Sequence, residues 1–254
     1  MAPRVVRFVG LKGSGKTYAI TKVAQKLIEY DMKVAVVKSL GEHDINIPGT
    51  DTYKFMQIVD HVVAVGRYSI AYITKLKEKL LPVIVKSIPY TVDIILVEGF
   101  KGDTNSPKVI CARNLNEVKK LSDGFEIAIV GPIASKANKI LQRSMDKPII
   151  NVDNPNELES LVKLIIEKSF ILPGINCKKC GLSCSELAKK IVKGEESINK
   201  CIYRAKREKK VKVVIDNVQL ELNPFIEEMI KSTIRGLLRP LKGYREGRIT
   251  IEIY

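Results

Sequence analysis

Short apolar runs alternate with stretches of helical spacing from the N-terminus to about Lys168. The apolar runs are rich in β-branched residues, which favour strands; we predict strands at 5–9, 33–37, 62–65, 94–97, 109–111, 127–130 and 149–152. Between them, apolar residues recur with the period of about 3.6 that is typical of helices; these stretches are 19–30, 114–121, 135–142 and 155–168. Such alternation predicts an α/β fold with a mostly parallel sheet covered by crossover helices.

The pattern changes after Phe170, where Leu172-Pro173-Gly174 interrupts the chain. Four of the five cysteines follow between residues 177 and 201. Further on, alternating residues around Asp216-Asn217 predict a β-hairpin, and Pro224 is placed to open a helix. The predicted elements are strands at 211–215 and 219–222, a helix at 224–238 and a final strand at 248–253. We therefore predict three parts: an α/β domain at 1–168, a cysteine-rich module at 169–205 and a small α+β segment at 206–254.

Residues 10–17 read Gly-Leu-Lys-Gly-Ser-Gly-Lys-Thr, which matches the phosphate-binding loop pattern of P-loop NTPases. Glycines let the backbone curl around phosphate oxygens, so that N–H groups and the next helix N-terminus point at the anion. Lys16 is expected to reach the β- and γ-phosphates, and Thr17 to offer its hydroxyl to Mg²⁺. The order strand, loop, helix supports this interpretation over a chance glycine-rich turn. The candidate nucleotide-binding residues here are Gly10, Lys12, Gly13, Ser14, Gly15, Lys16, Thr17 and Tyr18.

A Mg²⁺ ion at such a loop also needs an acidic residue at the end of a neighbouring buried strand. Glu98 stands where the apolar run at 94–97 stops, so we assign it to the Mg²⁺ shell or to positioning the attacking water. The alternative is that Glu98 merely ends a strand. Asp93 stands at the other end of this run and is expected to face solvent. Lys16 and Glu98 are the candidate catalytic residues.

A long polar loop follows Lys38, which stands at the end of the second predicted strand. In open α/β sheets ligands lie beyond the carboxyl ends of strands, so this loop is placed to meet nucleotide or substrate. Lys38 and Asp51 are its candidate binding residues. His43 is either an acid–base group or a solvated loop histidine.

These segments resemble the molybdopterin-guanine dinucleotide biosynthesis protein B (MobB) family. The resemblance rests on the 10–17 loop, Lys38, Pro48-Gly49-Thr50-Asp51-Thr52-Tyr53, Val97-Glu98-Gly99-Phe100-Lys101 and Pro107-Lys108-Val109, and it covers about residues 1–165. It implies a GTP-binding accessory protein with weak GTPase activity and a dimeric state. It also implies a partner, the nucleotidyltransferase that joins GMP to molybdopterin, or another factor of molybdoenzyme maturation.

Two departures from the family pattern bear on ligand choice. The family usually has a histidine-rich stretch after the second strand, where this chain keeps only His43. The chain also has no Asn-Lys-x-Asp or Thr-Lys-x-Asp segment of the kind that reads guanine in regulatory GTPases. GTP as the nucleotide therefore follows from the resemblance, and ATP stays open from the residues alone.

Cys177, Cys180, Cys184 and Cys201 have the spacing C-x2-C-x3-C-x16-C. In a cytosolic chain, such clustered cysteines favour metal binding over disulfides. Four thiolates suit an iron–sulfur cluster or Zn²⁺, and unliganded thiols are a further alternative. The segment resembles the four-cysteine [4Fe-4S] domain of corrinoid iron–sulfur proteins, with one residue fewer between the second and third cysteines. Cys111, inside an apolar run, is expected to be a buried residue and not a ligand.

Composition and charge limit the remaining classes of function. No apolar stretch approaches the roughly 20 residues of a membrane-spanning helix, and no secretory signal is evident, so we expect a cytoplasmic protein. The net charge of +15 attracts polyanions. Its densest segment, 200–212, is either a nucleic-acid arm or a solvated basic linker, and we favour the linker because Tyr203 is its one aromatic residue. Besides the accessory GTPase, the sequence leaves open an ATP-dependent redox or metallocentre-insertion accessory.

Overall fold

The computed structural model describes most of the chain in two compact units, residues 1–204 and 205–254. The described residues are 4–41, 44–45, 47–76, 79–88, 92–135, 145–203, 211, 213–215, 218–220, 222, 224–245, 247 and 249–251. None of the helices in these ranges combines the length and hydrophobicity needed to cross a bilayer.

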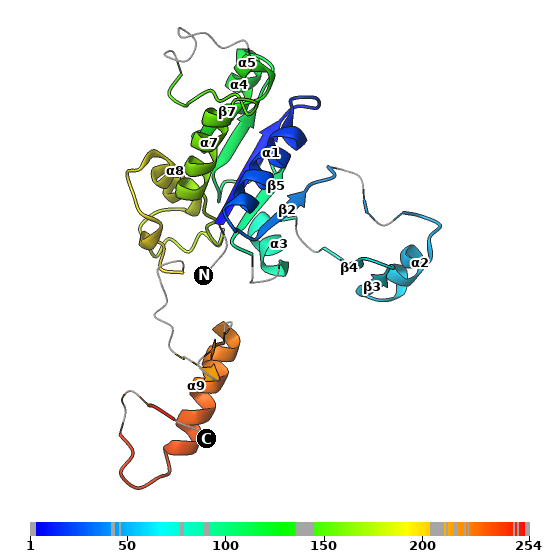
Figure 1. Ribbon diagram of the computed structural model, residues 1–254. Helices are drawn as coiled ribbons and strands as arrows, with labels where there is room; N and C mark the ends of the chain where they lie inside the picture. Colours follow the sequence, from blue (N-terminus) through cyan, green and yellow to red (C-terminus); the bar gives the residue numbers. More distant parts are fainter. Residues whose placement is uncertain are drawn as a thin grey trace. The chain divides into compact units, whose positions relative to one another are not determined.

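A five-stranded sheet forms the centre of the first unit (Figure 1). Its strands are β1 (Arg4–Gly10), β2 (Val34–Lys38), β5 (Ile94–Glu98), β6 (Lys108–Cys111) and β7 (Glu126–Val130). The order across the sheet is β2-β5-β1-β6-β7, and all neighbouring pairs are parallel. β1 and β5 are buried on both faces, as expected when helices cover a parallel sheet on each side. The predicted α/β fold is confirmed.

Helices pack on both faces of this sheet. On one face, α1 (Lys16–Glu29) and α7 (Pro155–Lys168) lie side by side (Figure 1) and share one hydrophobic core with alternate strand residues such as Val6 and Phe8. On the other face, α3 (Leu81–Ile84) packs on the β1 and β5 side chains that point the opposite way. The short helices α4 (Leu115–Leu121) and α5 (Pro132–Ser135) pack against β6 and β7 on that face. The predicted α7 is confirmed at both ends: Asn154 caps it by accepting from the N–H groups of Asn156 and Glu157, at 3.0 and 3.4 Å.

Two strand predictions for the first unit were wrong in part. The run at 62–65 is a strand, β3 (His61–Val65), but it pairs antiparallel with β4 (Ile70–Thr74) and not with the central sheet. A tight turn, closed by a 2.8 Å bond from Gly66 N–H to the Ser69 carbonyl, makes this local pairing possible. The helix α2 (Asp51–Ile58) precedes the hairpin.

The run at 149–152 forms one parallel bridge, between Ile129 and Ile149, and no full strand. The N–H of Asn151 donates instead to the carboxylate of Glu157 at 2.7 Å, which ends the ladder after Ile150. The predicted helix at 135–142 falls mostly outside the described residues, although α5 ends at Ser135.

The cysteine module, residues 169–203 of the described chain, follows α7. An extended segment leads to the helix α8 (Cys184–Lys193) and then to a 3₁₀ turn, η2 (Ile198–Lys200). Ser183 and Glu186 form a capping box at the start of α8, and Gly194 ends it in a left-handed conformation. Cys184 and Cys201 belong to the same hydrophobic core as α1 and the sheet.

Within its described residues, the second unit contains a short hairpin and a helix. β8 (Val214–Ile215) and β9 (Val218–Gln219) pair antiparallel, as the sequence predicted, though with shorter strands. α9 runs from Pro224 to Leu238, the predicted helix. The structure describes residues 249–251 of the predicted final strand, and they are not in a strand. An alternation of apolar and polar residues does not by itself supply the second strand that a hydrogen-bonded ladder requires. Most of the basic segment at 204–212 lies outside the described residues.

Candidate functional site

The phosphate-binding loop joins the end of β1 to the start of α1. Gly13 and Gly15 have φ values of +75° and +82°, in the left-handed region where glycine is favoured. Gly15 is also the N-cap of α1, so Lys16 and Thr17 occupy the first turn of the helix. A helix N-terminus presents free N–H groups and a partial positive charge, which together stabilise an anion.

The loop is packed too tightly to accept larger residues. A Cβ on Gly10 would lie 2.2 Å from Ser14 Oγ and 2.4 Å from the Cys111 carbonyl oxygen. A Cβ on Gly131, which follows β7, would lie 2.7 Å from the Ser14 carbonyl oxygen. Ser14 Oγ is buried and has no hydrogen-bond partner among the described residues. An unpaired buried hydroxyl in a phosphate loop suits an anionic ligand, because such groups are otherwise costly to bury.

Thr17 and Glu98 meet across the mouth of the loop. Thr17 Oγ1 donates to Glu98 Oε2 at 3.0 Å. Lys38 Nζ lies 3.8 Å from the same carboxylate oxygen, and Lys38 and Glu98 are register partners in the parallel pair β2–β5. The sheet therefore brings together two oxygen donors that are 81 residues apart in the sequence. A threonine hydroxyl and a carboxylate are ligands that suit Mg²⁺.

Lys16 lies across the loop, and its Nζ donates to the Leu11 carbonyl oxygen at 2.8 Å. This bond holds the ammonium group above the loop. Beneath the loop, Cys111 is fully buried, and burial raises the pKa of its thiol to about 12. The prediction that Cys111 is a buried residue is confirmed. Asp93 is exposed and accepts from the N–H of Lys33 at 2.8 Å, so it lies at the opposite end of β5, as expected.

A cavity of about 1200 Å³ opens beside the loop, and we call it the phosphate-loop cavity. Gly10, Lys16, Lys38 and Glu98 line it. Its charged lining is predominantly basic, with five lysines against Glu98 and Asp103; the lysines are Lys12, Lys16, Lys38, Lys79 and Lys101. This charge favours a polyanionic ligand.

A buried ion pair supports one wall of the phosphate-loop cavity. The wall is the loop 99–105 that follows β5. Arg7, in the middle of β1 and fully buried, donates to the Phe100 carbonyl at 2.9 Å and to Ser106 Oγ at 2.9 Å. Its Nε also lies 3.3 Å from Asp103 Oδ2. Burial lowers the pKa of Arg7 below its usual value, and Asp103 acts against this shift.

The structure places two of the predicted residues, Tyr18 and Asp51, away from the lining of this cavity. Tyr18 is half exposed, and its hydroxyl donates to the carboxylate of Asp153. Asp51 begins α2, where its carboxylate pairs with Lys54 Nζ at 3.1 Å. His43 lies outside the described residues.

Other residues line the cavity that sequence reasoning missed. They are Lys79, which donates to the Gly41 carbonyl at 2.6 Å, and Asn105, Gly174 and Asn176. The loop after β5 could have been predicted as part of the site, because it follows the carboxyl end of a buried strand. No sequence feature indicated Gly174 and Asn176, because only the fold brings the cysteine module to this cavity.

The four clustered cysteines differ in their burial. Cys184 and Cys201 are buried, Cys180 packs against the same core, and Cys177 is exposed. Among the described residues, no three histidine, cysteine, aspartate or glutamate side chains are close enough to hold a metal ion. The donor set still fits an iron–sulfur cluster or Zn²⁺, since four thiols lie on one short module and three of them are on its inner side.

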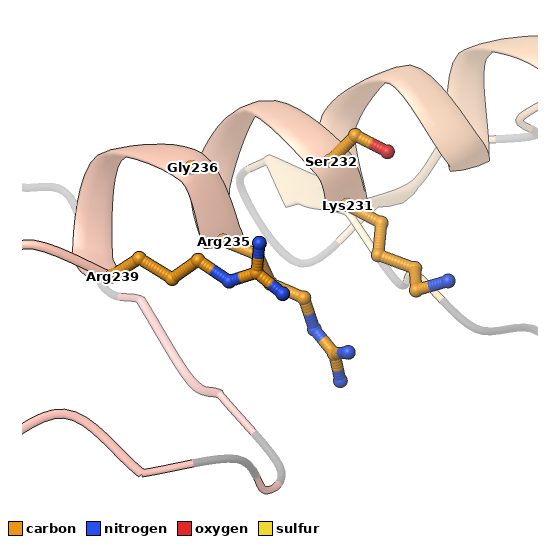
Figure 2. A pocket seen from close by; sticks show the side chains of 5 residues that line it. All are labelled: Lys231, Ser232, Arg235, Gly236 and Arg239. Atoms are coloured by element: carbon orange, nitrogen blue, oxygen red, sulfur yellow. The ribbon is translucent and has the colours of Figure 1, made fainter.

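A shallow pocket of about 230 Å³ lies on α9 in the second unit. Figure 2 shows Lys231, Arg235 and Arg239 projecting from one side of the helix. They are four residues apart, so they share a face. Basic residues near a helix C-terminus complement the helix dipole, which accounts for this face without a ligand.

The chain is similar to known proteins in sequence and in fold. The family model described as "Molybdopterin guanine dinucleotide synthesis protein B" matches residues 5–131, and the model described as "Putative Fe-S cluster" matches residues 172–203. A "Putative molybdopterin-guanine dinucleotide biosynthesis adapter protein" from Methanocaldococcus jannaschii is 26% identical over 256 residues, covering 98% of this chain and 97% of the relative. The crystal structure of Bacillus subtilis MobB has a TM-score of 0.51 at 22% identity, covering 63% of this chain and 97% of that one. The similarity to the Bacillus subtilis structure is evidence for a shared fold.

Proposed function

Because the chain belongs to the MobB family, we propose that it binds GTP with Mg²⁺ in the phosphate-loop cavity and assists molybdopterin-guanine dinucleotide biosynthesis in the cytoplasm. Its own GTPase activity is weak, and it acts as an adapter. The relative from Methanocaldococcus jannaschii, which is named as an adapter of this biosynthesis, matches nearly the whole chain and supports the role.

The observation that carries the nucleotide site is the 3.0 Å hydrogen bond between Thr17 and Glu98. The phosphate loop is a local motif, but Glu98 comes from a distant strand and still reaches the threonine hydroxyl. Ser14, buried and unpaired among the described residues, supports the same site from inside the loop.

Each residue then has a role in the bound state. Loop N–H groups and Lys16 stabilise negative charge on the phosphates. Thr17 and Glu98 hold Mg²⁺, which supplies further charge neutralisation at the phosphates when bound. Lys38 balances the carboxylate of Glu98 from the neighbouring strand.

The cavity leaves room for more than a nucleotide. Its volume of about 1200 Å³ exceeds that of most small-molecule pockets, which are about 300–1,000 Å³. Lys79 and Lys101 extend its basic lining beyond the loop. We therefore place the pterin substrate, or a segment of the nucleotidyltransferase partner, next to the nucleotide, with the 38–53 segment as a further contact.

A homodimer is part of the proposal, supported by the β3–β4 hairpin. Val65, Tyr68 and Ile70 are 75%, 87% and 72% exposed. Large exposed apolar side chains gathered on one hairpin favour burial against a second copy. Sedimentation of the Val65→Asp variant tests this: a monomer is expected, whereas an unchanged dimer removes the hairpin from the interface.

The four-cysteine module completes the proposal as an iron–sulfur site, with Zn²⁺ as the alternative. The match of residues 172–203 to an Fe-S family supports it. Anaerobic purification is expected to give a brown protein with about four iron atoms per chain. A colourless protein with one zinc contradicts the cluster.

The test of the main proposal is an anaerobic titration with Mg²⁺-GTP and Mg²⁺-ATP. A preference for GTP of about tenfold or more, about 1.4 kcal/mol, is expected. Lys16→Ala should abolish binding, while Lys22→Ala, on the same helix, should leave it unchanged. Equal affinity or a preference for ATP favours an ATP-dependent redox or metallocentre-insertion accessory instead, and unchanged binding by Lys16→Ala refutes the site.

A further inference from the structure

The entry segment of the cysteine module forms part of the wall of the phosphate-loop cavity. Gly174 and Asn176 line the same cavity as Lys16 and Glu98. Cys177 is the next residue in the chain. A candidate metal ligand therefore directly follows a residue of the cavity wall in the chain.

Direct hydrogen bonds tie this segment to the loop that follows β5. The N–H of Leu172 donates to the Asn105 carbonyl at 2.8 Å, and Asn105 Nδ2 donates to Asp103 Oδ1 at 3.0 Å. Gly174 is packed closely against that loop, because a Cβ placed there would lie 3.3 Å from Asn105 Nδ2. The cavity wall and the entry segment are therefore joined by a backbone hydrogen bond and by close packing.

Asn176 links this wall to a second cysteine. Its Oδ1 accepts from the N–H of Cys184, the first residue of α8, at 2.9 Å. Its φ of +45° lies in the left-handed region, and Lys178, two residues on, has a φ of +56°. Cys177 therefore sits between two backbone turns that non-glycine residues rarely adopt.

Cys177 is exposed, whereas Cys184 and Cys201 are buried. A group bound by Cys177 and Cys184 acts on Asn176 directly, because Cys177 is the next residue in the chain and the Cys184 N–H donates to the Asn176 side chain. We propose that Asn176 couples the two sites, so that loading the four-cysteine module with iron and sulfide changes the affinity of the phosphate-loop cavity for Mg²⁺-GTP. This inference rests on the proposed function.

Coupling of this kind is reciprocal: the nucleotide must change the affinity of the module for its metal by the same factor. Typical coupling between two sites in a protein is about 5- to 150-fold. We expect the dissociation constant of Mg²⁺-GTP to differ by about fivefold or more between the loaded and metal-free forms.

The experiment measures Mg²⁺-GTP affinity of the full chain in two states, under anaerobic conditions. One state is reconstituted with ferrous iron and sulfide, and the other is stripped with a chelator. Visible absorption and iron content report the loading, and circular dichroism reports the fold. The quantity compared is the ratio of the two dissociation constants, which cancels any effect of a substitution on nucleotide binding itself.

Three variants make the ratio specific to Asn176. Asn176→Gly keeps the left-handed backbone but removes the acceptor for Cys184, and its ratio should fall below about twofold, under the range typical of coupled sites. Asn176→Asp keeps an acceptor oxygen and tolerates the same φ, and its ratio should stay near the wild-type value. Asn199→Gly, in η2 of the same module and away from the cavity, is the matched control and should also behave as wild type.

The outcomes separate this inference from the proposed function. Tight Mg²⁺-GTP binding with equal constants in both states overturns the coupling and leaves the nucleotide site intact. Equal ratios in the wild type and Asn176→Gly overturn the role of Asn176. Absence of GTP binding in either state overturns the proposed function itself, and failure to take up iron overturns both the cluster and the coupling.

Discussion

Replacing Arg7 with methionine tests whether the buried ion pair holds the wall of the phosphate-loop cavity. Arg7→Met keeps a long side chain in the core but removes the hydrogen bonds to Phe100 and Ser106 and the contact with Asp103. Removing one partner of a buried pair usually costs about 3–5 kcal/mol, because the remaining charge is left without its counter-ion.

The loss should fall at the low end of that range. The Asp103 carboxylate keeps three donors after the substitution: the Asn105 backbone N–H at 3.1 Å, Asn105 Nδ2 at 3.0 Å and Ser106 Oγ at 2.7 Å. We expect the free energy of unfolding to fall by about 3 kcal/mol, which for a unit of this size lowers Tm by about 6–12 °C.

Thermal and urea denaturation followed by circular dichroism measure this loss. Arg4→Met is the matched control, because Arg4 lies on the same strand but is exposed, and its effect should stay within about 0.5 kcal/mol. The double variant Arg7→Met with Asp103→Asn should lose less than the sum of the two single variants, since no buried charge remains unpaired. A loss of under about 1 kcal/mol for Arg7→Met, or strict additivity in the double variant, refutes the reasoning.

Three further predictions concern the rest of the first unit. Cys111, whose pKa is raised by burial to about 12, should resist iodoacetamide at pH 8 in the native protein while exposed Cys177 reacts, as read by mass spectrometry; labelling of Cys111 contradicts its burial. Ser183→Ala removes the N-cap of α8 and should lower the free energy of unfolding by about 0.5–2 kcal/mol in urea titrations. Hydrogen bonds from Arg113 hold the pKa of Glu117 below its usual 4.5, so its contribution to stability is present above about pH 4.5 and is lost as the pH falls through the lowered value. Glu117→Gln should flatten this part of the stability curve, and an unchanged curve contradicts the assignment.

The sequence predicted the parts of the fold that depend on local pattern. The five strands of the central sheet, α1, α7 and α9 all follow from periodicity and from start signals such as Asn154-Pro155. The phosphate loop and Glu98 were predicted for the same reason, since motif and strand end can be read along the chain. Pairing partners were harder, because β3 has the composition of a sheet strand and only its turn at Gly66 directs it to β4.

The residues missed at the site are those that tertiary packing supplies. Lys79 and Asn176 come from segments with no motif, and they reach the cavity only through the path of the folded chain. Tyr18 shows the opposite failure: it follows the motif directly, but helical geometry turns its ring away, toward Asp153. Position next to a motif is therefore a weaker guide than position at the carboxyl end of a strand.

The shared hydrophobic core has a consequence for how the protein is assembled in the cell. Cys184 and Cys201 are buried together with Val6, Phe8 and the apolar face of α1. Their sulfur atoms leave solvent when that core closes, so a metal or cluster must arrive during folding or wait for α8 to open. The rate at which folded protein takes up iron is therefore a measure of the rate at which α8 opens. A chain cut after α7 would expose the apolar surface that these two cysteines now cover.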